Sequence, residues 1–130
     1  MAIQESSQSI SFEIVPKAVF VPQESRPEVG YYFFAYHITI RNTGTTAAQL
    51  LSRHWVILDG HNQTEEVKGS GVVGLQPRIL PGQSFDYQSA CPLRTPTGSM
   101  RGSFQMVTDA GENFTIQIPE FYLVSPNSLH

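Results

Sequence analysis

The stretch YYFFAYHITIRN, residues 31–42, is the strongest strand signal in the chain, and the rest of the fold is predicted around it. Nearly every residue in it favours extended structure. Its large apolar side chains recur at every second position and therefore share one face: Phe34, Tyr36, Ile38 and Ile40. An apolar face of this length needs a second layer to cover it, so we predict a central strand of an all-β domain.

Shorter runs with the same alternation lie on both sides of this stretch, divided by turn signals. Strands are predicted at 10–15, 19–21, 50–58, 64–68, 84–88, 103–107 and 114–118, the last extended through 119–123. Pro16 is expected to end the first strand. Polar connections are predicted at 22–30, 42–46, 59–62 and 109–112, and longer irregular loops at 69–82 and 90–98. No window has the ten or more helix-period residues that a helix needs, so we predict an antiparallel β-sandwich of about seven to eight strands rather than a small barrel.

Composition limits the class of protein. The 130 residues fit one domain, with a core at about 8–124 and frayed ends. Charged residues are sparse and the net charge is -3, which does not suggest a nucleic-acid partner. Cys91 is the single cysteine, so an internal disulfide is excluded and a reducing cytoplasm fits best. The sequence has neither a signal peptide pattern nor an apolar run that would span a bilayer, so we expect no membrane partner.

The predicted strand at 50–58 has aliphatic residues on both faces. Trp55 is the only tryptophan, and we predict that its face, shared with Leu51, Arg53 and Ile57, is the core face. Arg53 would then point inward near the start of the strand, where its charge needs a partner.

The segment EEVKGSGVVG, residues 65–74, spells G-x-G-x-x-G after a predicted strand. The dinucleotide-binding form of this motif requires a following helix, but Pro77 arrives instead and no helical pattern follows. The P-loop form requires a lysine and a hydroxyl where Leu75 and Gln76 stand. We favour a structural role, in which the glycines adopt positive φ or let backbones approach closely.

The alternative role for the segment is a weak anion site made of backbone N–H groups, which needs glycine but no helix. Its residues would be Gly69, Ser70, Gly71, Val72, Val73 and Gly74. Four arginines would flank the site if the fold gathers them: Arg53, Arg78, Arg94 and Arg101.

No other residues form a recognisable chemical set. His54, Asp59 and His61 match no established metal-ligand spacing, and a histidine in a hairpin turn is typically solvated. Cys91 lacks a local signature of a histidine base and is expected to be a buried or half-buried thiol. We therefore predict no catalytic residues, no metal and no cofactor.

Several stretches resemble the ApaG family closely: QLLSRHW at 49–55, EVKGSGVVG at 66–74, LPGQSFDY at 80–87, TPTGSMRG at 95–102 and IPEF at 118–121. With their order and spacing, the resemblance covers residues from about 10 to 123. It implies a fibronectin type III-like β-sandwich, found as a stand-alone bacterial protein and as a domain of some eukaryotic F-box proteins, where an adaptor or recognition role is suspected. It also implies a link to cobalt and magnesium resistance, which must be indirect because a chain without a transmembrane segment is not itself an efflux pump. The family's G-x-G-x-x-G has been considered a pyrophosphate-binding loop, and this sequence keeps the glycines but has Leu75 where glutamate is common.

From these observations we expect a non-enzymatic binding module, a monomer or weak homodimer, that presents its glycine loop to a pyrophosphate-like anion or a protein partner. One alternative is a phosphohydrolase acting on pyrophosphate-containing nucleotides, although the sequence shows no metal-binding carboxylate cluster, no general base and no lysine near the loop. Another is a protein–protein module that pairs through an exposed sheet edge.

Overall fold

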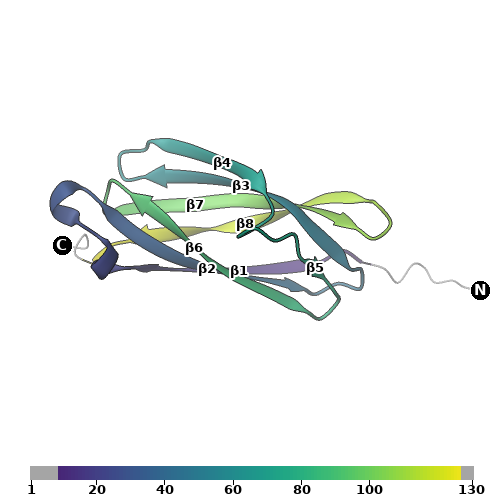
Figure 1. The fold of residues 1–130 in the computed structure, drawn as a ribbon. Coiled ribbons are helices and arrows are strands. Elements are labelled where there is room, and N and C mark those ends of the chain that lie inside the picture. The colour runs from purple at the N-terminus through teal and green to yellow at the C-terminus, as the bar shows by residue number, and fades with distance from the viewer. Residues whose placement is uncertain (1–8, 127–130) are drawn as a thin grey trace, which may run out of the picture.

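Two antiparallel sheets make up most of residues 9–126, the part of the chain that the computed structural model describes (Figure 1). The three-stranded sheet has the order β1 (Phe12–Phe20), β2 (Tyr32–Asn42), β6 (Ser84–Leu93). The five-stranded sheet has the order β4 (Thr64–Ser70), β3 (Ala48–Asp59), β7 (Thr97–Thr108), β8 (Asn113–Val124), and the two-residue strand β5 (Arg78–Ile79) also pairs with β3. The predicted all-β sandwich is confirmed.

The predicted 22–30 connection contains two short 3₁₀ turns, η1 (Pro22–Glu24) and η2 (Pro27–Val29). Neither is long or apolar enough to cross a membrane. The expected frayed N-terminus, like residues 127–130, lies outside the described residues.

The core lies between the sheets, where β2 contributes the apolar face predicted from its alternation. Phe34, Ile38 and Ile40 are all fully buried. Tyr36 crosses the interface and packs edge-on against Trp55 of the other sheet, with 5.5 Å between the ring centroids. Trp55 is 2% exposed, so the predicted core face of β3 is confirmed. Each such large side chain contributes about 1.5–3 kcal/mol when fully buried.

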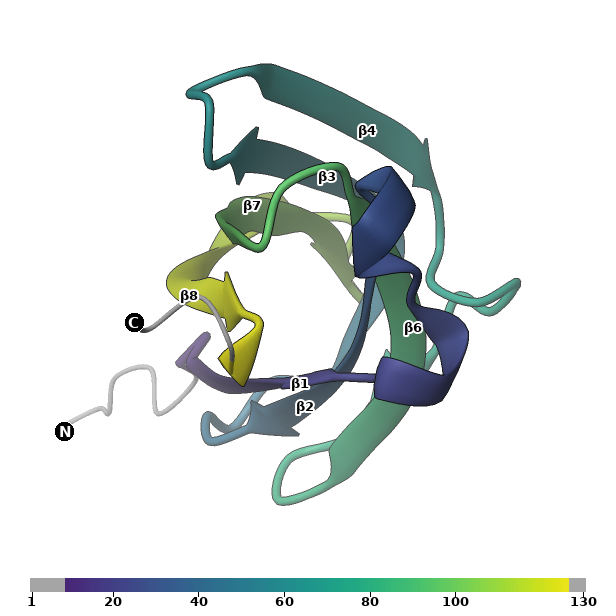
Figure 2. The same ribbon diagram turned by 90° about the vertical axis from the view of Figure 1, so that its left-hand side faces the viewer.

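The sandwich is closed along one side and open along the other. β1 lies close beside β8, as Figure 2 shows, whereas β4 and β6 form the free edges on the opposite side. A crevice of about 260 Å³ separates these edges, with Trp55 and Val67 on one wall and Tyr36 and Cys91 on the other. Cys91 is buried, as predicted, and burial raises the pKa of its thiol to about 11.

The prediction that Pro16 ends the first strand was wrong. β1 continues through it to Phe20, and Pro16 pairs with Ile38 of β2. β1 has β2 as its only paired neighbour, and an edge strand tolerates a residue without an N–H group. The predicted pieces at 10–15 and 19–21 are therefore parts of one strand.

Strict alternation also failed in β3, where Leu50 and Trp55 belong to opposite faces by sequence but are both buried. A β-bulge between Leu50 and Ser52 explains this, because the extra residue reverses which positions point inward. Ala48 and Leu50 face the core before the bulge, and Trp55 faces it afterwards.

Two of the predicted connections and the predicted C-terminal tail are shorter than expected. The irregular loop at 90–98 shrinks because β6 runs to Leu93 and β7 begins at Thr97, so β7 is much longer than the predicted 103–107. The loop at 69–82 contains β5, which pairs with Ala48 and Gln49. The C-terminal tail was predicted to be frayed from Ser125 onward. Ser125 is instead 3% exposed, and its N–H donates to Pro96 O at 2.8 Å.

Candidate functional site

The glycine segment ends β4 and reverses the chain in a two-residue turn. Val72 N donates to Leu75 O and Leu75 N donates to Val72 O, both at 2.8 Å. The two residues between them have positive φ, 43° at Val73 and 80° at Gly74. Positive φ at both central positions defines a type I′ turn, the form that suits two-residue hairpin loops. We call Val72–Leu75 the glycine turn.

Each glycine of the motif has a structural reason. A Cβ at Gly69 would lie 2.8 Å from the guanidinium of Arg53. Gly71 has φ 63°, and a Cβ there would lie 2.3 Å from Leu75 O. Gly74 has open space around it but supplies the second positive φ of the turn.

Two backbone N–H groups of the segment are used within the fold. Gly71 N donates to Leu51 O at 2.8 Å, and Val72 N donates within the turn. Gly69 and Ser70 belong to the edge strand β4 and pair with Arg53 and Ser52 of β3. An anion site made of backbone N–H groups would therefore have to do without the donors of Gly71 and Val72.

Arg53 donates hydrogen bonds to backbone carbonyls just before the glycine turn. These carbonyls are the partner that the inward-pointing charge of Arg53 was predicted to need. Its Nη1 donates to Ser70 O at 3.0 Å and to Gly71 O at 2.9 Å. Nε and Nη2 make no hydrogen bond to other described residues, so they remain available as donors.

Arg53 also lines an open hollow of about 470 Å³ beside the turn. We call it the basic hollow, and its six residues are Ser52, Arg53, His54, Lys68, Gly69 and Gln105. The side chains of Lys68 and His54 lie on the outer face of the sheet, whereas that of Arg53 lies on the inner face with Trp55. None of the six residues carries a carboxylate. Gln105 is held in place, since its Oε1 accepts from Ser52 Oγ and its Nε2 donates to Ser103 Oγ, both at 2.8 Å.

Lys68 was missed by the sequence analysis, which described the loop as having no lysine near it. A strand residue was overlooked because the search followed the P-loop pattern, in which lysine comes from the loop itself. The register of β4 places Lys68 opposite His54, on the strand that also carries Arg53. Period-2 alternation along 64–68, combined with the hairpin signal at 59–62, could have found this pairing.

Glu66 lies at the rim of the basic hollow and contacts His54. His54 Nε2 and Glu66 Oε1 lie 2.9 Å apart. The hydrogen bond and charge of His54 lower the pKa of the Glu66 carboxyl below its ordinary value.

The other three arginines are not gathered at the glycine turn. Arg78 forms a two-pronged ion pair with Asp109, Nε to Oδ1 at 3.0 Å and Nη2 to Oδ2 at 2.5 Å, which raises the pKa of Arg78 and lowers that of Asp109. Arg94 lines a hollow beside Asp59 and Glu65. Arg101 lines a hollow with His54 and Glu120, away from the glycine segment. Of the four, Arg53 alone contacts the expected site.

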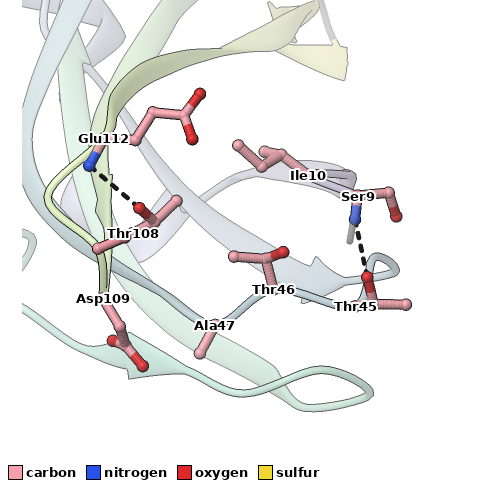
Figure 3. A pocket seen from close by; sticks show the side chains of 9 residues that line it. Ser9, Ile10, Thr45, Thr46, Ala47, Thr108, Asp109 and Glu112 are labelled. Carbon is pink, nitrogen blue, oxygen red and sulfur yellow. Dashed lines mark hydrogen bonds between the residues drawn. The ribbon is translucent and has the colours of Figure 1, made fainter. Parts of the chain in front are cut away.

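A larger hollow, about 600 Å³, lies where the segment before β1 meets the β2–β3 and β7–β8 turns (Figure 3). Its polar groups hold those turns together. Glu112 N donates to Thr108 Oγ1 at 3.1 Å, and Ser9 N donates to Thr45 Oγ1 at 2.7 Å. Asp109 from the same lining is paired with Arg78. This hollow is therefore a junction of loops.

Among residues 9–126, no group of three or more histidine, cysteine, aspartate or glutamate side chains gathers around one point. Asp59 uses Oδ1 to accept from His61 N at 2.8 Å and from Gln63 N at 2.9 Å, so it stabilises its own turn. His61 is exposed in that turn.

The ApaG domain model matches residues 22–108 of the chain. Protein ApaG of Bdellovibrio bacteriovorus is 61% identical over 119 residues, 92% of this chain and 94% of that protein. Protein ApaG of Dechloromonas aromatica is 52% identical over 118 residues, 91% of this chain and 93% of that protein. A crystal structure of a Bordetella pertussis protein described as ApaA superposes with a TM-score of 0.89 at 43% identity, covering 93% of this chain and 98% of that one.

Proposed function

The chain belongs to the ApaG family, and we propose that it is a non-enzymatic binding module whose basic hollow takes a ligand carrying an oxyanion, such as pyrophosphate. The observation that carries the proposal is the cross-strand pair of Lys68 and His54, which faces an open hollow with no carboxylate in its lining. This keeps the anionic ligand expected from the sequence but assigns its recognition to side chains instead of backbone N–H groups.

The donors of the hollow differ in freedom, which suits recognition of a group with several oxygens. The side-chain amide of Gln105 is held by its bonds to Ser52 and Ser103. Lys68 is exposed and brings a mobile point charge. Because the hollow is open to water, we expect an affinity near 1 mM, which corresponds to about -4.1 kcal/mol.

Binding is favoured over catalysis by the chemistry of the lining. Apart from His54, the lining side chains are donors, amides or hydroxyls, and His54 Nε2 is already bonded to Glu66. A phosphohydrolase would need a group placed to activate water at the bound phosphate. A steady-state assay with diadenosine polyphosphates and added metal tests this choice, and turnover that is lost in Lys68→Gln would overturn it.

Titration of pyrophosphate into isotopically labelled protein at constant ionic strength tests the site. The signals of Lys68, Gly69 and the His54 ring should shift before those of Arg78, Arg94 and Arg101. Lys68→Gln should weaken binding about two- to fivefold, as expected for the loss of one exposed charge contact.

The matched control is Lys17→Gln, which removes the same charge from an exposed position on β1. It should leave the affinity unchanged. Equal weakening by both variants, or shifts spread over all the arginines, would show a nonspecific charge effect and contradict the proposal.

A further inference from the structure

The open side of the sandwich leaves one strand edge ready to pair with another chain. β4 pairs with β3 alone and β6 pairs with β2 alone, and no described strand lies beyond either of them on this side (Figure 2). β6 contains Pro92, which lacks an N–H group and so interrupts the donors of that edge. β4 contains no proline, so its backbone groups that face away from β3 can bind a further strand.

The inner face of β4 borders the crevice between the two edges and carries a different chemistry at each position. Alternate residues of a strand share a face, so Glu65, Val67 and Gly69 all face inward. Glu65 and Val67 line the crevice, as does Arg53. The guanidinium of Arg53 occupies the space over Gly69, since a Cβ there would lie 2.8 Å from its Cζ. Along this edge the crevice is therefore acidic at Glu65, apolar at Val67 and basic at Arg53.

Neither charge is neutralised by another described residue. Arg53 donates from Nη1 to two backbone carbonyls, and neither Arg53 nor Glu65 belongs to an ion pair within residues 9–126. Nε and Nη2 of Arg53 are therefore available to a carboxylate from outside the chain. Charges on an edge strand also discourage pairing with an arbitrary strand. Their order along β4 then decides which strand is accepted, because only one with complementary charges avoids repulsion.

The spacing of the two charges sets the class of ligand. Glu65 and Gly69 are four residues apart on one strand, which corresponds to about 13 Å at about 3.3 Å per residue. A ligand that contacts both Glu65 and the guanidinium over Gly69 needs opposite charges a similar distance apart. Residues i and i+4 of an extended peptide have this spacing and share one face, with residue i+2 between them. A single amino acid or a pyrophosphate is too short.

We propose that the free edge of β4 binds an extended segment of another protein with the sequence pattern acidic–x–apolar–x–basic. The segment pairs antiparallel to β4, the arrangement that is more stable per residue. Its acidic side chain then binds Arg53, its apolar side chain enters the crevice beside Val67 and Trp55, and its basic side chain contacts Glu65. This site lies on the inner face of the sheet, apart from Lys68 and His54, so the inference is independent of the proposed oxyanion site.

The experiment titrates the isotopically labelled full chain with the capped peptide Thr-Glu-Thr-Leu-Thr-Lys-Thr, whose threonines favour the extended state. The peptide should shift the amide signals of Glu65, Val67 and Gly69 and the indole N–H signal of Trp55. It should also slow hydrogen exchange at alternate residues of β4, because pairing gives their N–H groups acceptors.

Two control peptides test the pattern. Thr-Lys-Thr-Leu-Thr-Glu-Thr has the same composition with the charges exchanged, and it should bind at least about tenfold more weakly because like charges then meet at both ends. Thr-Glu-Thr-Ser-Thr-Lys-Thr keeps the charges and should bind about fivefold more weakly, since it buries no leucine in the crevice.

Glu65→Lys reverses one charge at an exposed position of the edge. It should weaken binding of the first peptide about fivefold and strengthen binding of a version with glutamate in place of lysine by a similar factor. The matched control is Glu66→Lys, the same change at the next residue, which faces outward. It should alter both affinities by less than about twofold, because an exposed charge on the other face is screened from the peptide.

Equal binding of the charge-exchanged peptide would contradict the proposal, as would equal effects of Glu65→Lys and Glu66→Lys. Peptide-induced shifts without slower exchange in β4 would show contact without strand pairing and would also overturn it. A β4 that responds to none of the peptides at millimolar concentration would do the same. The pyrophosphate titration reports on the outer face, so its outcome stands apart from all of these.

Discussion

The two turns that flank β4 reverse the chain with opposite chemistry. Before β4, Asp59 N donates to Gln63 O at 3.0 Å, and Asn62 takes the positive φ, 63°. The carboxylate of Asp59 accepts two further backbone N–H groups of the same turn. After β4, the glycine turn uses Val73 at positive φ and has no side-chain acceptor of this kind. The first turn is polar and self-sufficient, whereas the second is apolar and strained.

This difference separates residues that serve the fold from residues that do not. Asparagine tolerates the left-handed region and aspartate bonds to its own backbone, so the Asp59–Gln63 turn is fully explained by chain reversal. Val73 makes chain reversal harder, and its 54% exposed side chain gains little from burial. The predictions below test this contrast.

Trp55→Ala should have the largest effect, because Trp55 lies in the shared core beneath β4, opposite Val67 in the strand register. Loss of its contacts with Tyr36 and Phe121 should cost about 3–5 kcal/mol of the free energy of unfolding. Denaturant melts measure this loss. Trp55→Phe should cost less, since Trp55 Nε1 has no hydrogen-bond partner among the described residues. A loss below about 0.5 kcal/mol in Trp55→Ala would be typical of a surface position. It would show that Trp55 does not support β4 and its two flanking turns from the core.

Gly71→Ala should have the next largest effect, about 2–3 kcal/mol, since a Cβ both meets Leu75 O and occupies a left-handed residue. Gly82→Ala is the matched control, with φ 83° and open space around it, and should cost about 1 kcal/mol. Equal losses in the two variants would mean that the glycine turn moves away from the added Cβ at Gly71 at no extra cost. The glycine turn would then not be rigid.

Exchanging the residues of the two turns should give effects of opposite sign. Val73→Asn should raise the free energy of unfolding by about 1 kcal/mol, and Asn62→Val should lower it by about the same amount. Chemical denaturation of both variants measures the changes. If Val73→Asn is neutral or destabilising, the valine is not strained and the contrast between the turns disappears.

The smallest effect concerns Glu66 at the rim of the basic hollow. Its carboxyl has a lowered pKa in the folded protein, so its contribution to stability is present above its ordinary pKa and is lost as the pH falls through the lowered value. In His54→Asn the pKa of Glu66 should rise towards its ordinary value, because the hydrogen bond from His54 is the main cause of the shift. Carboxyl signals followed by NMR during a pH titration measure it, and an unchanged Glu66 pKa would show that the pair does not form in solution.

Much of the fold follows from local pattern. The alternation in residues 31–42 made β2 central, the lone tryptophan identified the core face of β3, and the signals at 59–62 and 109–112 gave the two hairpin turns. These features depend on neighbouring residues, whose propensities and period the sequence displays directly.

The candidate site depends on contacts between residues far apart in the chain, so sequence alone could not assemble it. The bulge after Leu50 decides which side chains of β3 point inward, and it arises from pairing with β7. Lys68 and His54 share a hollow only because the register of β3 with β4 pairs them. The sequence by itself determined strands, turns and a glycine segment, since these are local. Tertiary structure decided that Arg53 binds the segment's carbonyls, that three arginines lie elsewhere and that Val73 is held at positive φ, because register and strain are set by long-range packing.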